Sequence, residues 1–251
     1  MINTAIEAAQ KAGQLAYRYF KSQPKVTYKP DDSPVTRADI EAEKLIRKII
    51  TKKFPDHGII GEELPPVNPK SRYQWVIDPI DGTRYFTQSF PFWGTLLAVL
   101  ENKQPIIGIA YLPVTDEFFT AQKNKGAYLN DKKIMVSKIS KLESSTIIAS
   151  AGTNYFAKIN KLEALIKLHG KTLCRIGIGG IYGYTQVAAG KAEICLDPVS
   201  EIYDIAAPSI LVTEADGKFT DLKGKFTLSS GAFLATNGLL HNQVLKILNA
   251  Q

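Results

Sequence analysis

The sequence predicts a protein of mixed α/β class, with an α+β first half and a second half in which helices and strands alternate. Two stretches with helical spacing of apolar residues open the chain, and from residue 59 short apolar runs separated by turns replace them. After residue 145 such runs alternate with further helical stretches. Two helices followed by a meander of strands predict a largely antiparallel sheet packed against helices.

The first half is expected to hold two helices and six strands. The first helix spans 4–20, where apolar residues recur every three or four positions, and the second begins near Thr36 and ends before the turn at 55–58. The expected strands are 59–60, 74–77, 94–100, 106–112, 117–120 and 126–129.

The second half is expected to follow α/β order. The expected strands are 145–149, 173–176, 192–196, 217–220 and 232–236, and the expected helices are 156–168, 182–189, 203–214 and 239–248. We expect an N-terminal α+β subdomain, 1–137, and a C-terminal α/β subdomain, 138–251. Because no Gly/Ser-rich linker separates them, the two halves are expected to share an interface.

Composition narrows the class of protein. The chain has 251 residues, 45% of them hydrophobic, so it can form a core without disulfides. Its two cysteines, Cys174 and Cys195, lie among apolar residues and are expected to be buried free thiols, which is typical of a reducing compartment. The first residues lack the apolar region of a signal peptide, and no apolar run is long enough to span a membrane. A soluble, cytoplasmic protein is therefore expected.

Charge argues against a dedicated nucleic-acid surface. The net charge is +7, divided between 19 basic and 15 acidic residues in 1–135 and 12 basic and 9 acidic residues in 136–251. Nucleic-acid-binding proteins usually gather basic residues on one face. An evenly spread positive charge suits a protein whose ligand is a small anion.

Acidic residues recur where predicted strands end. They are Glu62 and Glu63 in the GEE segment, Asp78 and Asp81 in the DPIDGT segment, and Asp204 in the YDIAA segment. Rigid elements present such residues to solvent. Carboxylates without neighbouring His or Cys suit Mg²⁺ better than Zn²⁺.

The DPIDGT segment can bring two carboxylates together. Pro79 restricts the residue before it to an extended conformation, and the following turn lets Asp78 and Asp81 converge around the backbone between them. Gly82 permits a positive φ, and a helix opened by Thr83 would present N–H groups to a phosphate.

Each acid also has a purely structural interpretation. The Asp-Gly pair at 81–82 is a common hairpin turn, and the GEE segment could be a solvated loop. Asp204 could be the N-cap of the following helix, and Thr36 with Asp39 resembles a capping box. The combination of acids, and not any one of them, favours a metal site.

Taken together and in this order, the three segments resemble the motifs of the inositol monophosphatase superfamily, the lithium-sensitive, Mg²⁺-dependent phosphatases. The family pattern is a GEE segment, a DPIDGT segment and a later W/Y-D-x-A-A segment, and the likeness covers nearly the whole chain. The resemblance implies a layered α-β-α-β-α sandwich, a homodimer, and hydrolysis of a small phosphorylated metabolite with two or three Mg²⁺ ions per site.

The resemblance also implies a role for individual residues. The implied metal ligands are Glu62, Glu63, Asp78, the Ile80 carbonyl, Asp81 and Asp204. The implied catalytic residues are Asp39, Glu62 and Thr83, with the Thr83 hydroxyl and the Asp39 carboxylate forming a pair that helps to deprotonate the attacking water. Gly82 and Thr83 would bind phosphate through backbone N–H groups. The implied substrate contacts are Asp81, Arg84, Gly180, Asp197 and Asp204.

The charges make a metal requirement reasonable. Five carboxylates in one cleft could not all stay ionised without cations. Divalent metals would restore the balance and activate water. Apart from those five acids the chain holds 31 basic and 19 acidic residues, so its wider surface can still attract an anion.

Motif details favour histidinol phosphate as the substrate. The segments DDSPVTRAD (31–39) and FPDHGI (54–59), and Arg84 after the DGT, resemble the histidinol-phosphate phosphatase group. Two departures are the lack of an Asp near Gly180 and the presence of Asp197 where that group has a Glu, which withdraws the contact by one methylene. The alternatives are inositol 1-phosphate or a related polyol or sugar phosphate, then fructose 1,6-bisphosphate or a 3′,5′-bisphosphate nucleotide.

A binding role is the alternative from another class. Some bacterial relatives of the superfamily act in transcription-antitermination complexes. No basic stripe interleaved with aromatic residues indicates RNA contact in this sequence. A gel shift with ribosomal leader RNA would separate this role from catalysis alone.

Overall fold

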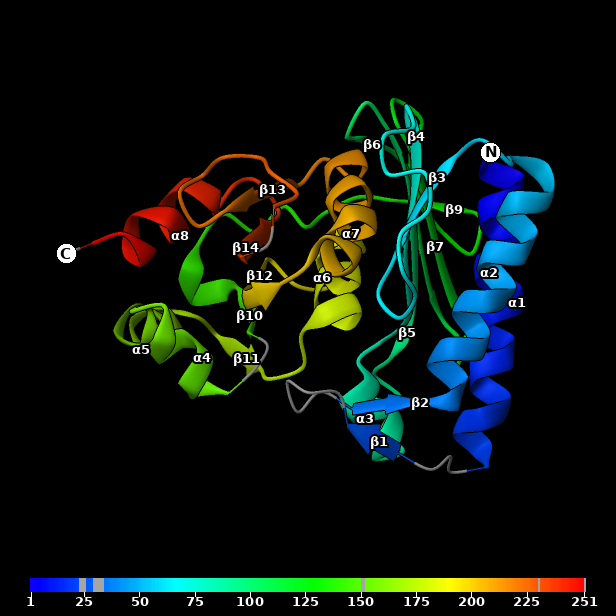
Figure 1. Ribbon diagram of the computed structural model, residues 1–251. Coiled ribbons are helices and arrows are strands. Elements are labelled where there is room, and N and C mark those ends of the chain that lie inside the picture. Colours follow the sequence, from blue (N-terminus) through cyan, green and yellow to red (C-terminus); the bar gives the residue numbers. More distant parts are fainter. Residues whose placement is uncertain (23–25, 29–33, 150–151, 230, 251) are drawn as a thin grey trace.

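Five layers of secondary structure, in the order α-β-α-β-α, form the protein (Figure 1). The structure is a computed structural model that describes residues 1–22, 26–28, 34–149, 152–229 and 231–250. The layered sandwich implied by the resemblance is confirmed. Residues 31–33 of the DDSPVTRAD segment lie outside the described residues.

Helices α1 (Ile2–Lys21) and α2 (Arg37–Lys53) form the first layer. Both were expected, and α2 begins at the predicted cap, Thr36, whose hydroxyl accepts a hydrogen bond from the Ala38 N–H. The face of α1 that is buried against the sheet is mostly alanine, which lets the helix lie close to the strands.

The second layer is a seven-stranded sheet in the order β3-β4-β5-β6-β7-β8-β9. Its strands are β3 (Gly58–Gly61), β4 (Tyr73–Asp81), β5 (Gly94–Glu101), β6 (Gln104–Leu112), β7 (Glu117–Gln122), β8 (Gly126–Leu129) and β9 (Lys132–Ile134). All neighbours are antiparallel except the pair β3 and β4, as the meander predicts. The short β9 was not predicted.

The central layer contains α6 (Gly180–Ala188) and α7 (Ile202–Glu214), which lie between the two sheets. The fourth layer is a five-stranded sheet in the order β11-β10-β12-β14-β13. Its strands are β10 (Thr146–Ala149), β11 (Cys174–Ile176), β12 (Ile194–Ser200), β13 (Lys218–Asp221) and β14 (Gly231–Thr236). The expected boundary at 137/138 falls between the segments that supply the two sheets. It stays a prediction.

Helices α4 (Thr153–Lys158), α5 (Leu162–Lys171) and α8 (His241–Leu248) cover the outer face of the second sheet. The single helix expected at 156–168 was wrong, because Asn160 has a positive φ of 55° and ends α4 before α5 begins. Cys174 is exposed, whereas Cys195 is buried as expected. Among the described residues, no helix has the length and apolar character needed to cross a membrane.

Smaller elements complete the fold. The antiparallel pair β1 (Val26–Tyr28) and β2 (Pro34–Thr36) and the short helix α3 (Thr83–Thr87) lie at one end of the large sheet. A 3₁₀ turn, η1 (Leu142–Ser144), precedes β10.

His241 makes the stability of the outer layer depend on pH. Its ring is buried between the hydroxyl groups of Thr220 and Thr236, at 3.0 and 2.9 Å. Burial, with the nearby charge of Lys218, lowers the pKa of His241 to about 4. The unfolded chain therefore binds a proton at a pH where the folded chain does not, so this stabilisation is complete above pH ~6.5 and is lost as the pH falls toward 4.

We expect the free energy of unfolding to fall by about 2 kcal/mol more in the wild type than in His241→Gln between pH 7 and pH 5. Glutamine keeps polar atoms near both hydroxyl groups but does not titrate. Urea unfolding at both pH values measures the difference. Equal losses in the two proteins would show that His241 does not take up the proton.

Candidate active site

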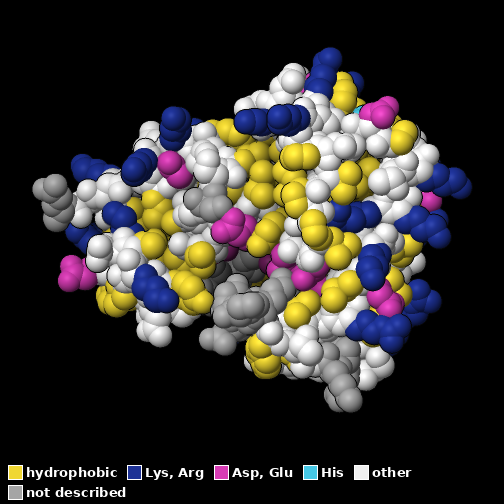
Figure 2. Space-filling model, in the orientation of Figure 1, with side chains coloured by type: hydrophobic (Ala, Val, Ile, Leu, Met, Phe, Trp, Pro, Cys, Tyr) yellow, Lys and Arg dark blue, Asp and Glu magenta, His cyan; other side chains and the backbone are white. Residues whose placement is uncertain are grey.

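Three carboxylates from distant parts of the chain meet at one end of the large sheet. Asp78 and Asp81 come from β4 and Asp204 from the first turn of α7, and each offers an oxygen atom within 4.8 Å of the others. Figure 2 shows acidic side chains in the hollow at the centre of one face, with Lys and Arg spread around it. The predicted convergence of the DPIDGT and YDIAA acids is therefore present.

An irregularity in β4 brings the first two acids together. The pairing of β4 with β5 shifts register between Asp78 and Asp81, so the strand bends at Pro79. The Asp78 carboxylate accepts a hydrogen bond from the Ile80 N–H at 3.0 Å, which holds it against the bend. The segment leads into α3 and not into a hairpin, so the hairpin interpretation of residues 81–82 was wrong.

The N-termini of two helices hold Asp81 and Asp204 in place. The Ile181 N–H, in the first turn of α6, donates a hydrogen bond to Asp81. Asp204 accepts one from the Glu201 N–H at 2.6 Å, so Glu201 is the N-cap and Asp204 is the third residue of a capping box. The alternative in which Asp204 is itself the N-cap was wrong, because the N-cap, Glu201, lies three residues earlier. Its carboxylate both caps the helix and faces the cluster.

Burial and mutual repulsion disfavour ionisation of all three acids. Burial, followed by the charges of Glu62, Asp81 and Asp204, raises the pKa of Asp78 well above its ordinary value. Burial also raises the pKa of Asp81, although the Ile181 N–H acts in the opposite direction. The pKa of Asp204 is raised by burial and by the charge of Asp81.

Asp39 lies next to this cluster with one oxygen unused. Its Oδ2 accepts hydrogen bonds from the Thr36 N–H at 2.8 Å and the Thr36 hydroxyl at 2.6 Å, while its buried Oδ1 has no hydrogen-bond partner. Burial is the main cause that raises the pKa of Asp39 to about 6, and the charge of Glu62 adds to it. The capping-box interpretation and a catalytic role are thus compatible, because they use different oxygens.

The Thr83 hydroxyl donates a hydrogen bond to the Ile80 carbonyl at 3.0 Å. The pairing of Thr83 with Asp39 therefore stays a prediction. Gly82 is the N-cap of α3 and has a φ of 89°, as the expected turn requires.

The GEE segment ends β3 beside these acids. The Glu62 N–H donates a hydrogen bond to the Ile77 carbonyl at 3.2 Å, which ties the segment to the strand that carries Asp78. The charge of Glu62 raises the pKa of Asp39, Asp78, Asp81 and Asp204, so Glu62 lies near all four. Glu63 is half-buried and follows it in the same loop.

The remaining predicted residues divide into two groups. Gly180 opens α6 against Asp81, and Asp197 is buried in β12, where its charge raises the pKa of Asp81. Arg84 is exposed on α3. Gly180 and Asp197 therefore lie near Asp81, and the substrate contacts implied for them and for Arg84 stay predictions.

The family model described as the inositol monophosphatase family matches residues 1–251. The chain belongs to the inositol monophosphatase family. It is 34% identical to a histidinol-phosphatase from Chlorobaculum parvum, over 100% of this chain and 97% of the relative. It is 32% identical to inositol monophosphatase 3 from Solanum lycopersicum, over 99% of this chain and 96% of the relative. The chain is also similar to the solved structure of the Thermotoga maritima IMPase TM1415, with a TM-score of 0.90 and 30% identity. The match covers 99% of this chain and 96% of that structure's chain.

Membership of the inositol monophosphatase family makes the chain a phosphoric monoester hydrolase. The family is Mg²⁺-dependent, and the residues at this site fit such an ion. All the clustered donors are carboxylate oxygens, which hard cations prefer. Burial is the first cause of their raised pKa values and the neighbouring carboxylate charges add to it, and a bound cation would favour the ionised forms.

Two features of this phosphatase site were missed in the sequence. One is a chain of three aromatic rings that begins beside Asp81 and Asp197 with Tyr85, whose centroid lies 6.1 Å from that of Phe92, and Phe92 lies 5.1 Å from Tyr182. Only their chain positions near the motifs could have indicated them. The second missed feature is Glu43, which lies on the apolar stripe of α2. A charged residue at such a position indicates a buried polar contact, so the sequence could have revealed it.

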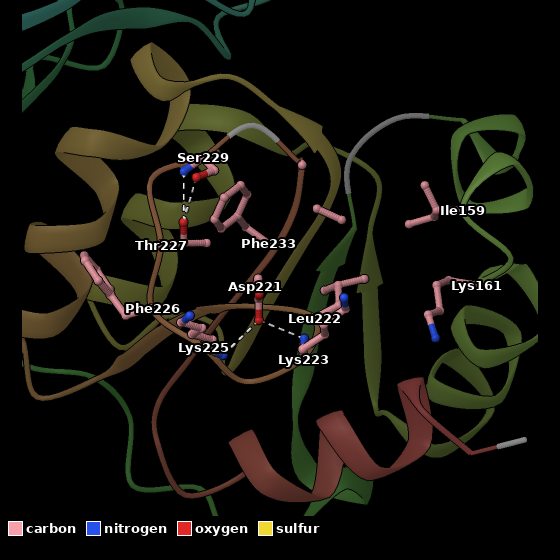
Figure 3. A pocket seen from close by; sticks show the side chains of 12 residues that line it. Ile159, Lys161, Asp221, Leu222, Lys223, Lys225, Phe226, Thr227, Ser229 and Phe233 are labelled. Carbon is pink, nitrogen blue, oxygen red and sulfur yellow. Dashed lines mark hydrogen bonds between the residues drawn. The ribbon is translucent and has the colours of Figure 1, made fainter.

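A separate pocket lies away from the acid cluster, in the outer layer of this family fold. Its volume is about 540 Å³, and it opens between the β13–β14 loop and the segment joining α4 to α5 (Figure 3). Its acid, Asp221, accepts hydrogen bonds from the N–H groups of Lys223 and Lys225, both at 2.8 Å. That carboxylate stabilises a turn, so the acid cluster and not this pocket is the candidate active site.

Proposed function

We propose that the protein is a histidinol-phosphate phosphatase that uses Mg²⁺. The observation that carries the choice of substrate is a buried carboxylate next to the acid cluster, which Asp197 supplies although its side chain is one methylene shorter than the Glu of the histidinol-phosphate phosphatase group. Apart from its phosphate, histidinol phosphate carries an ammonium group. Inositol 1-phosphate and related polyol phosphates offer only neutral hydroxyl groups to this carboxylate. A buried carboxylate favours the cationic group.

The chain would hold Mg²⁺ through the residues of the acid cluster and its neighbours. These are Glu62, Asp78, the Ile80 carbonyl, Asp81 and Asp204, with Glu63 alongside. When bound, Mg²⁺ supplies charge neutralisation and Lewis-acid activation of water.

Asp39 and the start of α3 would complete the catalytic groups. The unpartnered Oδ1 of Asp39 is available to accept a proton from the attacking water, directly or through the Thr83 hydroxyl. The N–H groups of Gly82, the N-cap, and of Thr83, the first residue of α3, would bind phosphate oxygens because N–H groups at a helix start have no partner within the helix.

The non-reacting part of the substrate would lie against Asp197 and the aromatic rings. Tyr85 is half-buried, and the charges of Asp81 and Asp197 both contribute to raising its pKa, so its ring lies near both carboxylates. An ammonium group or imidazole could contact the carboxylate of Asp197 and an aromatic face together. A polyol would gain only hydrogen bonds.

Steady-state kinetics with Mg²⁺ test the substrate. We expect kcat/KM to be higher for histidinol phosphate than for inositol 1-phosphate, fructose 1,6-bisphosphate and a 3′,5′-bisphosphate nucleotide. Asp197→Asn should lower kcat/KM for histidinol phosphate by about 10- to 100-fold, the value of a charge-assisted hydrogen bond, and should change the inositol phosphate value far less. A preference for inositol 1-phosphate, or equal losses on both substrates, would count against the proposal.

A further inference from the structure

A buried ion pair on α2 lies directly behind the GEE segment. Glu43 is fully buried one helical turn after Asp39, and Arg47 follows after another turn. We propose that Glu43 and Arg47 are positioning residues that fix the loop carrying Glu62 so that this carboxylate faces the acid cluster. The inference rests on the proposed metal site and adds to it two residues that do not bind the ion.

Glu43 binds the backbone of the loop on the far side of Glu62. Its Oε2 accepts a hydrogen bond from the Glu63 N–H at 2.8 Å, and its Oε1 accepts one from the Leu64 N–H at 3.3 Å. Because the Glu62 N–H is bonded to the Ile77 carbonyl, the loop is held on both sides of the Glu62 side chain. The backbone position from which the Glu62 side chain extends is therefore fixed.

Arg47 extends the same contact to the next residues. Its guanidinium bonds Glu43 at 2.8 Å, and it donates to the carbonyls of Leu64 and Pro65 at 2.8 and 2.9 Å. The pair therefore satisfies N–H and carbonyl groups of three consecutive loop residues, from Glu63 to Pro65. Lysine could not replace this fork, since one ammonium group lacks the planar geometry.

Gly61 shows how closely the loop lies on the carboxylate. A Cβ atom at this position would lie 2.1 Å from Oε1 and 2.4 Å from Cδ of Glu43. The main chain just before Glu62 is therefore in direct contact with Glu43. A shift of the carboxylate would move the backbone of a predicted metal ligand.

Stability alone is a poor explanation for this pair. Burying two charges costs several kcal/mol, and apolar residues of similar volume are often as stable or more so. A helix that faces an apolar sheet could complete its stripe with leucine. The contacts that leucine cannot provide are those to the loop backbone, and these contacts lead to Glu62.

The test compares Glu43→Gln with Glu214→Gln. Glu214 also holds a loop, by accepting hydrogen bonds from the N–H groups of Asn124, Lys125 and Gly126. It ends α7, ten residues after Asp204, about 15 Å away along the helix. Each variant replaces a carboxylate that accepts hydrogen bonds from backbone N–H groups of a loop. Only the loop held by Glu43 adjoins the proposed site.

We expect the dissociation constant of Mg²⁺, measured calorimetrically on metal-free protein, to rise about 10- to 100-fold in Glu43→Gln and to be unchanged in Glu214→Gln. Both variants should melt at a lower temperature. Arg47→Lys keeps the positive charge and should also raise the dissociation constant of Mg²⁺. This variant replaces Glu43→Gln in the test if Glu43→Gln does not fold.

The outcomes separate the two proposals. Wild-type Mg²⁺ affinity in Glu43→Gln or Arg47→Lys, or an equal loss in Glu214→Gln, would overturn the positioning role. A wild-type protein that neither binds Mg²⁺ nor hydrolyses phosphomonoesters would instead overturn the proposed function.

Discussion

Replacing Asp81 with asparagine is expected to weaken Mg²⁺ binding by more than about 100-fold and to lower kcat/KM by at least a similar factor. Loss of an outer partner of a metal ligand already costs 10- to 100-fold, and Asp81 is placed to be a ligand itself. Asparagine has nearly the same shape and can still accept the Ile181 N–H bond. The fold should therefore survive.

The metal-free variant offers a second measurement. Because the neighbouring charges of Asp78 and Asp204 repel Asp81, removing its charge should leave the metal-free protein at least as stable as the wild type. Addition of Mg²⁺ should raise the melting temperature of the wild type but not of the variant. Asp221→Asn, which changes an acid with two N–H partners outside the site, is the control. Normal turnover in Asp81→Asn would exclude the proposed site.

Local rules predicted the parts of the site that lie within one segment. The bend at Pro79 and the positive φ of Gly82 follow from the conformations allowed to proline and glycine, so the convergence of Asp78 and Asp81 was visible in six consecutive residues. The start of α2 at Thr36 was predictable for the same reason. Short-range sterics and capping decide these features.

Contacts between distant segments could not be predicted in this way. That Glu43 holds the GEE loop, or that α6 begins against Asp81, depends on how helices pack on the large sheet. Asn160 divides the helix expected at 156–168 through its own backbone conformation, although the apolar spacing continues past it. Periodicity predicts which face of an element is buried but not which backbone groups it will meet.

Gly180 is the position where such a distant contact leaves no room for a side chain. Its φ is +59°, and a Cβ atom would lie 2.9 Å from both carboxylate oxygens of Asp81. The residue after it, Ile181, donates its N–H to the same carboxylate. The start of α6 is thus fitted to Asp81 by its backbone.

Gly180→Ala is expected to lower kcat/KM by about 100-fold, because a displacement near 1 Å at reacting groups can cost that factor. The left-handed conformation adds about 1–2 kcal/mol of strain for alanine, so the melting temperature should also fall. Gly170→Ala in α5 is the matched control, since nothing lies within 4 Å of its Cβ position, and it should keep full activity with a slightly higher melting temperature. If Gly180→Ala were as active as Gly170→Ala, α6 could move away from Asp81 without consequence, and the contact between them would not fix the geometry of the site.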